Sequence, residues 1–312
     1  MQLLSTLTCT LYATFHCLQL HFPAHSISQI HRPRLNGIIK IGSREHNKWL
    51  LKRNVTEAIG LAQSKLASYH RVIAELPDTS WKREDLLIDG LLLEQENDLS
   101  LYYAPYDYVN PAAKVTIVGI TPGFTQMSIS LRQAKDDLAA GINLSEIDRR
   151  AKYAASFAGT MRRHLVDMLN KLGLPELLHV SDSSELFGDR RELIHTTSVI
   201  RYPLFHKGEN YTGHQPRMLS SQLIRKYAVH DFAHELAAVK DSVIIPLGKS
   251  VSDLLRYIDG EKPLPGERLH ERCLFDFPHP SGANGHRKKQ FELLKEHHIS
   301  ILQSKLGNHQ QL

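Results

Sequence analysis

Two short loops, far apart in the chain, contain residue types that could do chemistry together. One is the run His279-Pro280-Ser281, in which an imidazole ring can donate or accept a proton near neutral pH. The other is Gly119-Ile120-Thr121-Pro122-Gly123, which offers a hydroxyl, backbone N–H groups and two glycines. Glycine lets a ligand approach the backbone closely, so the two loops together indicate a hydrogen-bonding site.

Each loop follows a segment that has the pattern of a buried strand. Residues 114–119, 193–200, 242–248 and 274–277 are short and largely apolar, and helical patterns lie between them. Strands that alternate with helices favour a parallel sheet with helices on both faces. The predicted fold is therefore α/β, a three-layer α/β/α domain with a central four-stranded parallel sheet. Ligands bind at the carboxyl ends of strands in such sheets, where both loops lie.

The chain before these strands is predicted to be helical. Residues 49–76 carry apolar side chains at helical spacing, and Pro77 ends the pattern. We interpret residues 45–110 as an N-terminal helical extension and residues 111–312 as the α/β/α domain. Residues 1–44 contain no Asp or Glu and lack the basic start of a secretory or mitochondrial signal, so we expect a poorly ordered leader. A targeting signal and a start codon assigned too early are the alternatives.

The composition is that of a globular chain, with 42% hydrophobic and 23% charged residues. The net charge of +5 suits a polyanionic partner, although many proteins are this basic. There are three cysteines and no Cys-x-x-Cys pair, so we predict no metal and no other cofactor. No segment has the ~20 nearly uninterrupted apolar residues of a membrane helix. Because few cysteines suit a reducing compartment, we expect the protein to act in the cytoplasm, away from membranes. We also expect a monomer.

The order of the motifs resembles that of the uracil-DNA glycosylase superfamily over about residues 100–300. The loop at residues 119–123 is similar to the loop that activates water, and His279-Pro280-Ser281 is similar to the loop that stabilises the leaving base. Phe157-Ala158-Gly159 resembles a segment whose Phe ring stacks on the extruded base. Residues 197–203 and 243–250 resemble the second and third strands with their loops.

The resemblance implies a DNA glycosylase that hydrolyses the N-glycosidic bond of a flipped damaged or modified pyrimidine, either uracil or a bulkier base. This reaction needs a donor to the departing base, a positioned water and an extruded base. His279 would be the donor, Thr121 would hold the water, and Gln126 could assist. The residues around the base would be Gly119, Ile120, Gly123, Phe124, Phe157 and Ser198.

DNA is the partner that the resemblance implies. Backbone N–H groups and hydroxyls beside glycines would contact phosphates, and basic residues at the start of the last helix would add positive charge. The predicted DNA contacts are Pro122, Gly248, Lys249, Ser250, Ser281, Gly282, Asn284, Arg287 and Lys288. No lysine stands in a motif for a Schiff base, so we expect hydrolysis without strand cleavage.

Three positions depart from the family's pattern. Thr121 stands where relatives have Asp or Asn, and a hydroxyl is a poor base; Asp136 or Asp137 would supply a carboxylate if the following helix turned back. Ser198 replaces the Asn that reads the base edge, and offers only one rotatable hydroxyl. Gly123 replaces a bulky Tyr, which predicts room for a base larger than uracil, such as a hypermodified base of viral DNA. The alternative is a catalytically inactive DNA-binding member of the same fold.

Overall fold

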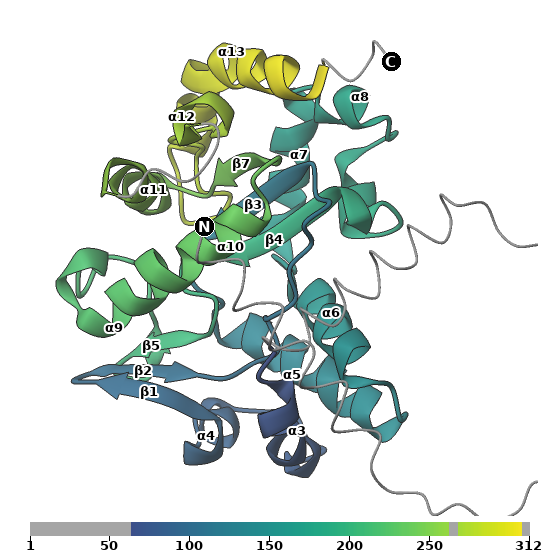
Figure 1. Cartoon of the computed structure of the whole chain (residues 1–312), viewed down its shortest axis with the longest axis vertical. Coiled ribbons are helices and arrows are strands. Elements are labelled where there is room, and N and C mark those ends of the chain that lie inside the picture. Colours follow the sequence, from purple (N-terminus) through teal and green to yellow (C-terminus); the bar gives the residue numbers. More distant parts are fainter. Residues whose placement is uncertain (1–63, 262–267, 308–312) are drawn as a thin grey trace, which may run out of the picture. The chain divides into compact units, whose positions relative to one another are not determined.

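The computed structural model describes residues 64–261 and 268–307. All of them belong to one compact unit, which spans Trp49–Leu312. The leader expected at residues 1–44, and the part of the predicted helix at residues 49–63, lie outside the described residues. The described residues form two sheets, one parallel and one antiparallel (Figure 1).

The parallel sheet has three strands in the order β4-β3-β7. They are β3 (Val115–Gly119), β4 (Ile194–Ser198) and β7 (Val243–Pro246). The pattern of buried apolar runs predicted all three. Every residue of the central strand β3 is buried, as expected for a parallel strand covered on both faces. Its last residue, Gly119, pairs with Ser198 at the end of β4, so the loops after these strands start side by side.

The fourth strand predicted at residues 274–277 is not formed. Cys273 makes a single parallel bridge to Ile244 in β7, and the chain then turns at Phe275 and Asp276. Asp276 has a φ of 61°, a left-handed conformation that cannot continue an extended strand. The segment still follows the edge of β7, because Gly248 N–H donates to Phe277 O at 2.8 Å. The loop of His279 therefore begins next to the loop after β7.

Helices cover both faces of the parallel sheet (Figure 1). Ile117 packs in one core with side chains of α7 (Thr160–Lys171) and α13 (Arg287–Leu306). Val118, the next residue, packs in a second core with α10 (Phe232–Ala238) and α11 (Lys249–Glu261). The remaining helices include α5 (Phe124–Ala139), α6 (Leu144–Ala155), α8 (Leu174–Leu178), α9 (Gln222–Arg225) and α12 (Leu269–Arg272), a π-helical turn at Lys226–Asp231, and 3₁₀ turns at Asp89–Leu91, Ser183–Phe187, Arg191–Leu193 and Met218–Ser220.

The antiparallel sheet was not predicted. Its strands, in the order β1-β2-β5-β6, are β1 (Leu92–Glu96), β2 (Leu99–Tyr102), β5 (Leu204–His206) and β6 (Glu209–Asn210). The segment at residues 45–110, predicted to be helical, thus contains a hairpin as well as α3 (Leu66–Glu75) and α4 (Arg83–Leu86). The hairpin turns at Asn97, whose φ is 52°, and Asn tolerates this conformation better than most residues.

The antiparallel sheet joins the N-terminal segment to the chain that follows β4. Leu99 in β2 pairs with His206 in β5, and β6 then lies at the edge of the sheet. There Asn210 Oδ1 accepts a hydrogen bond from Phe124 N–H at 2.9 Å, which connects β6 to the start of α5. No helix within the described ranges is long and apolar enough to cross a membrane.

Candidate functional site

A cavity of about 620 Å³ lies at the carboxyl ends of the three parallel strands. Most of the predicted site residues line it, although they come from five separate segments of the chain. The predicted residues in its wall are Gly119, Ile120, Thr121, Pro122, Gly123, Gln126, Phe157, Ser198, Gly248, Lys249, Ser250, His279, Ser281 and Asn284. The structure therefore brings together the two loops that first indicated a site.

Four predicted residues lie outside the cavity wall: Phe124, Gly282, Arg287 and Lys288. The Phe124 ring instead lies 5.3 Å from the guanidinium of Arg83. Arg287 donates to Ser281 O at 2.7 Å and to Pro280 O at 3.2 Å, so it braces the His279 loop. Lys288 and Gly282 are exposed beside that loop, where they remain accessible to a large ligand.

Gly119, Phe157 and Ser198 lie against one another in the cavity wall. A Cβ atom added to Gly119 would lie 3.3 Å from Ser198 Oγ and 3.5 Å from Phe157 Cε1. Phe157 follows the end of α6 with a φ of 47°, a conformation that costs a bulky residue about 1–3 kcal/mol. Because Gly119 has no side chain, the Phe157 ring can pack directly against its backbone.

His279 is arranged as a hydrogen-bond donor. Its Nδ1 accepts a hydrogen bond from Ser281 N–H at 3.2 Å, so the proton of a neutral ring lies on Nε2. Burial lowers the pKa of His279, which favours the neutral ring at pH 7. Asn284 Nδ2 donates to His279 O at 3.3 Å, and this bond helps to fix the loop. Nε2–H is left to donate to a ligand.

The hydroxyl of Thr121 is used inside the protein. It donates to Tyr202 O at 2.8 Å and accepts from Leu204 N–H at 3.0 Å, so it joins the first loop to the chain between β4 and β5. Gln126 has a similar role, because its Oε1 accepts from Gly123 N–H at 3.1 Å. These bonds explain how the first loop is held, and they leave neither group free to act as a base.

The space expected beside Gly123 is filled. A Cβ atom on Gly123 would lie 3.1 Å from both Asn210 Nδ2 and Gln126 Oε1. The prediction of extra room at this position is therefore corrected, because the side chains of Asn210 and Gln126 occupy the space beside Gly123. The bond from Phe124 N–H to Asn210 Oδ1 orients the carboxamide, and Asn210 also lines the cavity.

Sequence reasoning missed the segment after β6, which we call the β6 loop (Tyr211–Pro216). Tyr211, Thr212 and His214 line the cavity together with Asn210. Gly213 has a φ of 87°, and a Cβ atom there would lie 3.2 Å from Ile120 Cδ1 and 3.6 Å from Ser250 Cβ. The β6 loop thus fits between the first loop and the start of α11. In the sequence, Gly213 and Pro216, which lie on either side of His214, are the residues that could have indicated a loop here.

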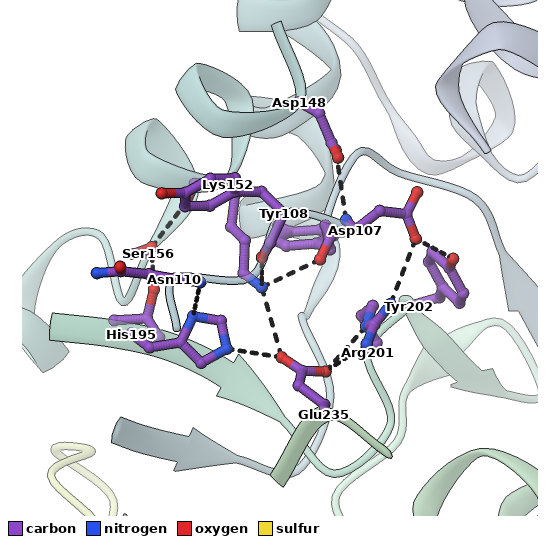
Figure 2. Close-up of polar contacts among 12 residues, drawn as sticks. Asp107, Tyr108, Asn110, Asp148, Lys152, Ser156, His195, Arg201, Tyr202 and Glu235 are labelled. Carbon is purple, nitrogen blue, oxygen red and sulfur yellow. Dashed lines mark hydrogen bonds and ion pairs between the residues drawn. The ribbon is translucent and has the colours of Figure 1, made fainter. Parts of the chain in front are cut away.

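Figure 2 shows an ionic cluster, which we call the wall cluster, and two of its members, Lys152 and Arg201, line the cavity. Glu235 is at its centre and accepts from Arg201 at 2.7 and 2.9 Å and from His195 Nε2 at 2.7 Å. Lys152 Nζ lies 3.7 Å from Glu235 and donates to two backbone carbonyls. The wall cluster consists of Asp107, Asp148, Lys152, His195, Arg201, Tyr202 and Glu235.

The wall cluster shifts the pKa of most of its members. Burial, and then the charge of Lys152, lower the pKa of His195 to about 4, so this ring is neutral and donates to Glu235. Burial also lowers the pKa of Lys152 to about 8. Although burial opposes it, the guanidinium of Arg201 holds the pKa of Glu235 well below its usual value. Burial and the nearby charge of Asp107 raise the pKa of Asp148 to about 7.

Apart from the tyrosines Tyr106 and Tyr211, the ionisable side chains in the cavity wall, as far as the structure describes the chain, are basic. They are Lys152, Arg201, His214, Lys249 and His279. Asp137, considered as a source of a carboxylate, instead pairs with Arg150 at 2.9 Å, and Asp136 likewise lies away from the cavity. The cavity therefore suits a ligand that carries or develops negative charge.

No family model matches this chain. Its sequence is 40% identical over 236 residues to the Bacillus subtilis (strain 168) protein named Uncharacterized protein YoxB. The alignment covers 75% of this chain and 90% of that relative. The chain belongs to the YoxB family. The cavity is thus a feature of one member of the YoxB family.

Proposed function

We propose that this chain is a DNA glycosylase of the uracil-DNA glycosylase superfamily, which hydrolyses the N-glycosidic bond of a flipped damaged or modified pyrimidine. The observation that carries the proposal is the meeting in one cavity of His279, set to donate from Nε2, and Phe157, whose ring lies against Gly119. Cleavage of the bond leaves negative charge on the base and positive charge on the sugar. A donor to the base and a surface on which the base can stack are what this reaction needs.

The proposed relationship implies a three-layer α/β/α fold with four parallel strands. In support, residues 273–277 run along the outer edge of β7, joined to it by the Ile244–Cys273 bridge and by the bond from Gly248 N–H to Phe277 O. This segment thus occupies the position of a fourth strand without forming a regular one. The two buried cores on opposite sides of β3 correspond to the outer layers.

The pyrimidine would stack on Phe157, where a base–aromatic contact contributes about 1–3 kcal/mol. His279 Nε2–H would donate to a base oxygen on which negative charge develops. The oriented NH₂ of Asn210 and the hydroxyl of Ser198 are placed to contact base edges from the two sheets. The volume of about 620 Å³ accommodates a nucleotide or a base bulkier than uracil.

DNA would approach through the loops that surround the cavity mouth. Gly248, with a φ of 93°, leads into the exposed Lys249 and into Ser250 at the start of α11. Backbone N–H groups at a helix start attract phosphates, and Lys249 would add a charge contact. Ser281 and Asn284 flank the other side of the cavity. We infer a monomer that acts on DNA in the cytoplasm, without a cofactor.

Release of free base from defined oligonucleotides tests this function. The panel contains uracil, hypoxanthine, mismatched thymine and 5-hydroxymethyl or glucosylated cytosine, in single- and double-stranded DNA. We expect one base to be released, with the DNA strand left uncut until the abasic site is cleaved by alkali. His279→Ala should reduce the rate by about 100- to 1000-fold.

A second function is favoured by one observation. Thr121 Oγ1 and Gln126 Oε1 are both used in internal hydrogen bonds, so the first loop supplies no free base. A DNA-binding protein without catalytic activity would tolerate this. That reading predicts tight binding of DNA with no base released from any member of the panel, and loss of binding when Lys249 and Lys288 are changed to alanine.

A further inference from the structure

Hydrolysis at this site needs a group that accepts a proton from the attacking water. The first loop does not provide one, because Thr121 donates its only hydroxyl proton to Tyr202 O and Gln126 is a carboxamide. Across the described residues, no carboxylate lines the cavity. The acceptor must therefore come from another element, if the reaction proposed above takes place.

Most basic groups of the cavity wall are unsuited to this task. Lys152 donates to the carbonyls of Tyr106 and Tyr108, and Arg201 is bound to Glu235 through two nitrogens. Lys249 is held in an ion pair with Asp253 at 2.7 Å. The Nδ1 of His279 already accepts a bond from Ser281. Of the basic groups identified in the wall, His214 is left as a proton acceptor.

The β6 loop holds His214 at the cavity from two sides. Tyr211 N–H donates to Leu204 O at 3.0 Å, and the buried Tyr211 side chain donates from its hydroxyl to Pro216 O at 2.6 Å. Gly213 is fitted between Ile120 and Ser250, and leaves no space there for a side chain. His214 follows directly, lines the cavity and is exposed to solvent. An exposed imidazole can pass an accepted proton on to water.

We propose that His214 is the general base of the reaction, a role that rests on the proposed glycosylase function. The water oxygen forms a bond to C1′ of the nucleotide while a ring nitrogen of His214 takes one water proton. The C1′–N bond breaks, and its electron pair leaves with the base. His279 Nε2–H donates a hydrogen bond to the anionic base, which then takes a proton from solvent. The two imidazoles thus have opposite roles, one as acceptor and one as donor.

The test compares single-turnover base release by the wild-type chain, His214→Ala and His230→Ala. His230 is a matched control, because it is an exposed histidine on the π-helical turn and does not line the cavity. We expect His214→Ala to slow release by about 100- to 10,000-fold, with DNA affinity unchanged. Added imidazole should restore part of the lost rate in His214→Ala and should leave His279→Ala unchanged.

The outcomes separate the two proposals. If the wild-type chain releases no base from any substrate, the glycosylase function and the role of His214 both fail. If the wild-type chain releases a base and His214→Ala does so at the same rate, only the assignment of His214 is overturned. The assignment of His214 is also overturned if His214→Ala is slow, is not rescued by imidazole, and loses DNA affinity by the same factor as it loses rate. His214 would then only contribute to DNA binding.

Discussion

Gly248 and His279 are in direct contact, so that a Cβ atom on Gly248 would lie 3.3 Å from the Cβ of His279. The loop after β7 and the loop that carries the donor are thus packed with no space between them. Gly248 also has a φ of 93°, a conformation that residues other than glycine rarely adopt. The position of the His279 imidazole therefore depends on a glycine 31 positions earlier in the chain.

Gly248→Ala should displace His279 and slow base release. The added methyl group pushes against the His279 side chain, and the strained backbone costs about 1–3 kcal/mol of stability. Single-turnover release and thermal unfolding measure the two effects. Gly141→Ala is the control, because Gly141 has a φ of 70° with nothing within 4 Å of its Cβ position. Equal losses of activity in the two variants would show that strain alone is responsible.

Phe157→Ala should weaken stacking of the extruded base. The loss should amount to about 1–3 kcal/mol in binding of a DNA that contains the target base. A fluorescent base analogue next to the target reports extrusion directly. His279→Ala is expected to extrude the base normally, since its defect lies in the later step. Normal extrusion by Phe157→Ala would mean that the ring is only part of the packing between α6 and α7.

Glu235→Gln should destabilise the fold strongly. Glu235 is buried and balances Arg201 and Lys152, so its loss removes the ion-pair partner of Lys152 and leaves Arg201 with the more distant carboxylate of Asp107 at 3.6 Å. Breaking such a pair costs about 3–5 kcal/mol, which urea unfolding would measure. Asp167→Asn removes an exposed pair with Lys171 and should cost at most about 1 kcal/mol. Similar costs for the two variants would contradict a structural role for the wall cluster.

Asp148→Asn should stabilise the chain at alkaline pH and have little effect at acidic pH. Burial and Asp107 raise the pKa of Asp148 from an ordinary value of 3.8 to about 7, against the opposing charges of Lys152 and Arg201. Between these values the folded chain binds more protons than the unfolded chain, so the contribution of Asp148 to stability falls as pH rises. The carboxamide oxygen of the variant could still accept the bond that Asp107 N–H makes to Asp148 Oδ1.

Urea unfolding at pH 5 and at pH 8 tests this sign. We expect the free energy of unfolding of the variant to exceed that of the wild-type chain by on the order of 1 kcal/mol or more at pH 8. At pH 5 the excess should be smaller, because only part of the interval between 3.8 and about 7 has then been crossed. A variant that is less stable than the wild-type chain at pH 8 would show that the Asp148 carboxylate is favourable in the fold.

The sequence predicted those parts of the fold that are encoded locally. β3, β4 and β7 are buried apolar runs that end near turn residues, and such runs can be recognised without knowledge of their partners. The fourth segment has a similar composition, but Asp276 adopts a left-handed conformation that a short window does not reveal. β5 and β6 are three and two residues long, and no local pattern predicts them, because β5 forms by pairing with β2 and β6 by pairing with β5.

The candidate site was predicted where it lies on strand ends and was missed where it depends on distant contacts. Gly119, Phe157 and His279 belong to short motifs, and they meet as expected. His214 lies in a loop whose position depends on the unpredicted antiparallel sheet. Glu235 stands in the middle of a helix, where a charged residue is usually exposed, and its burial is explained by Lys152, His195 and Arg201, all of which lie 34 or more positions away in the chain.

The most direct test measures by mass spectrometry the free base that the wild-type chain releases from the oligonucleotide panel. His279→Ala serves as the test variant, and His297→Ala, an exposed histidine on α13 away from the cavity, serves as the control. The account predicts release of one base by the wild-type chain and the control, and a loss of about 100- to 1000-fold in His279→Ala. Release at equal rates by all three, or by none of them, would contradict it.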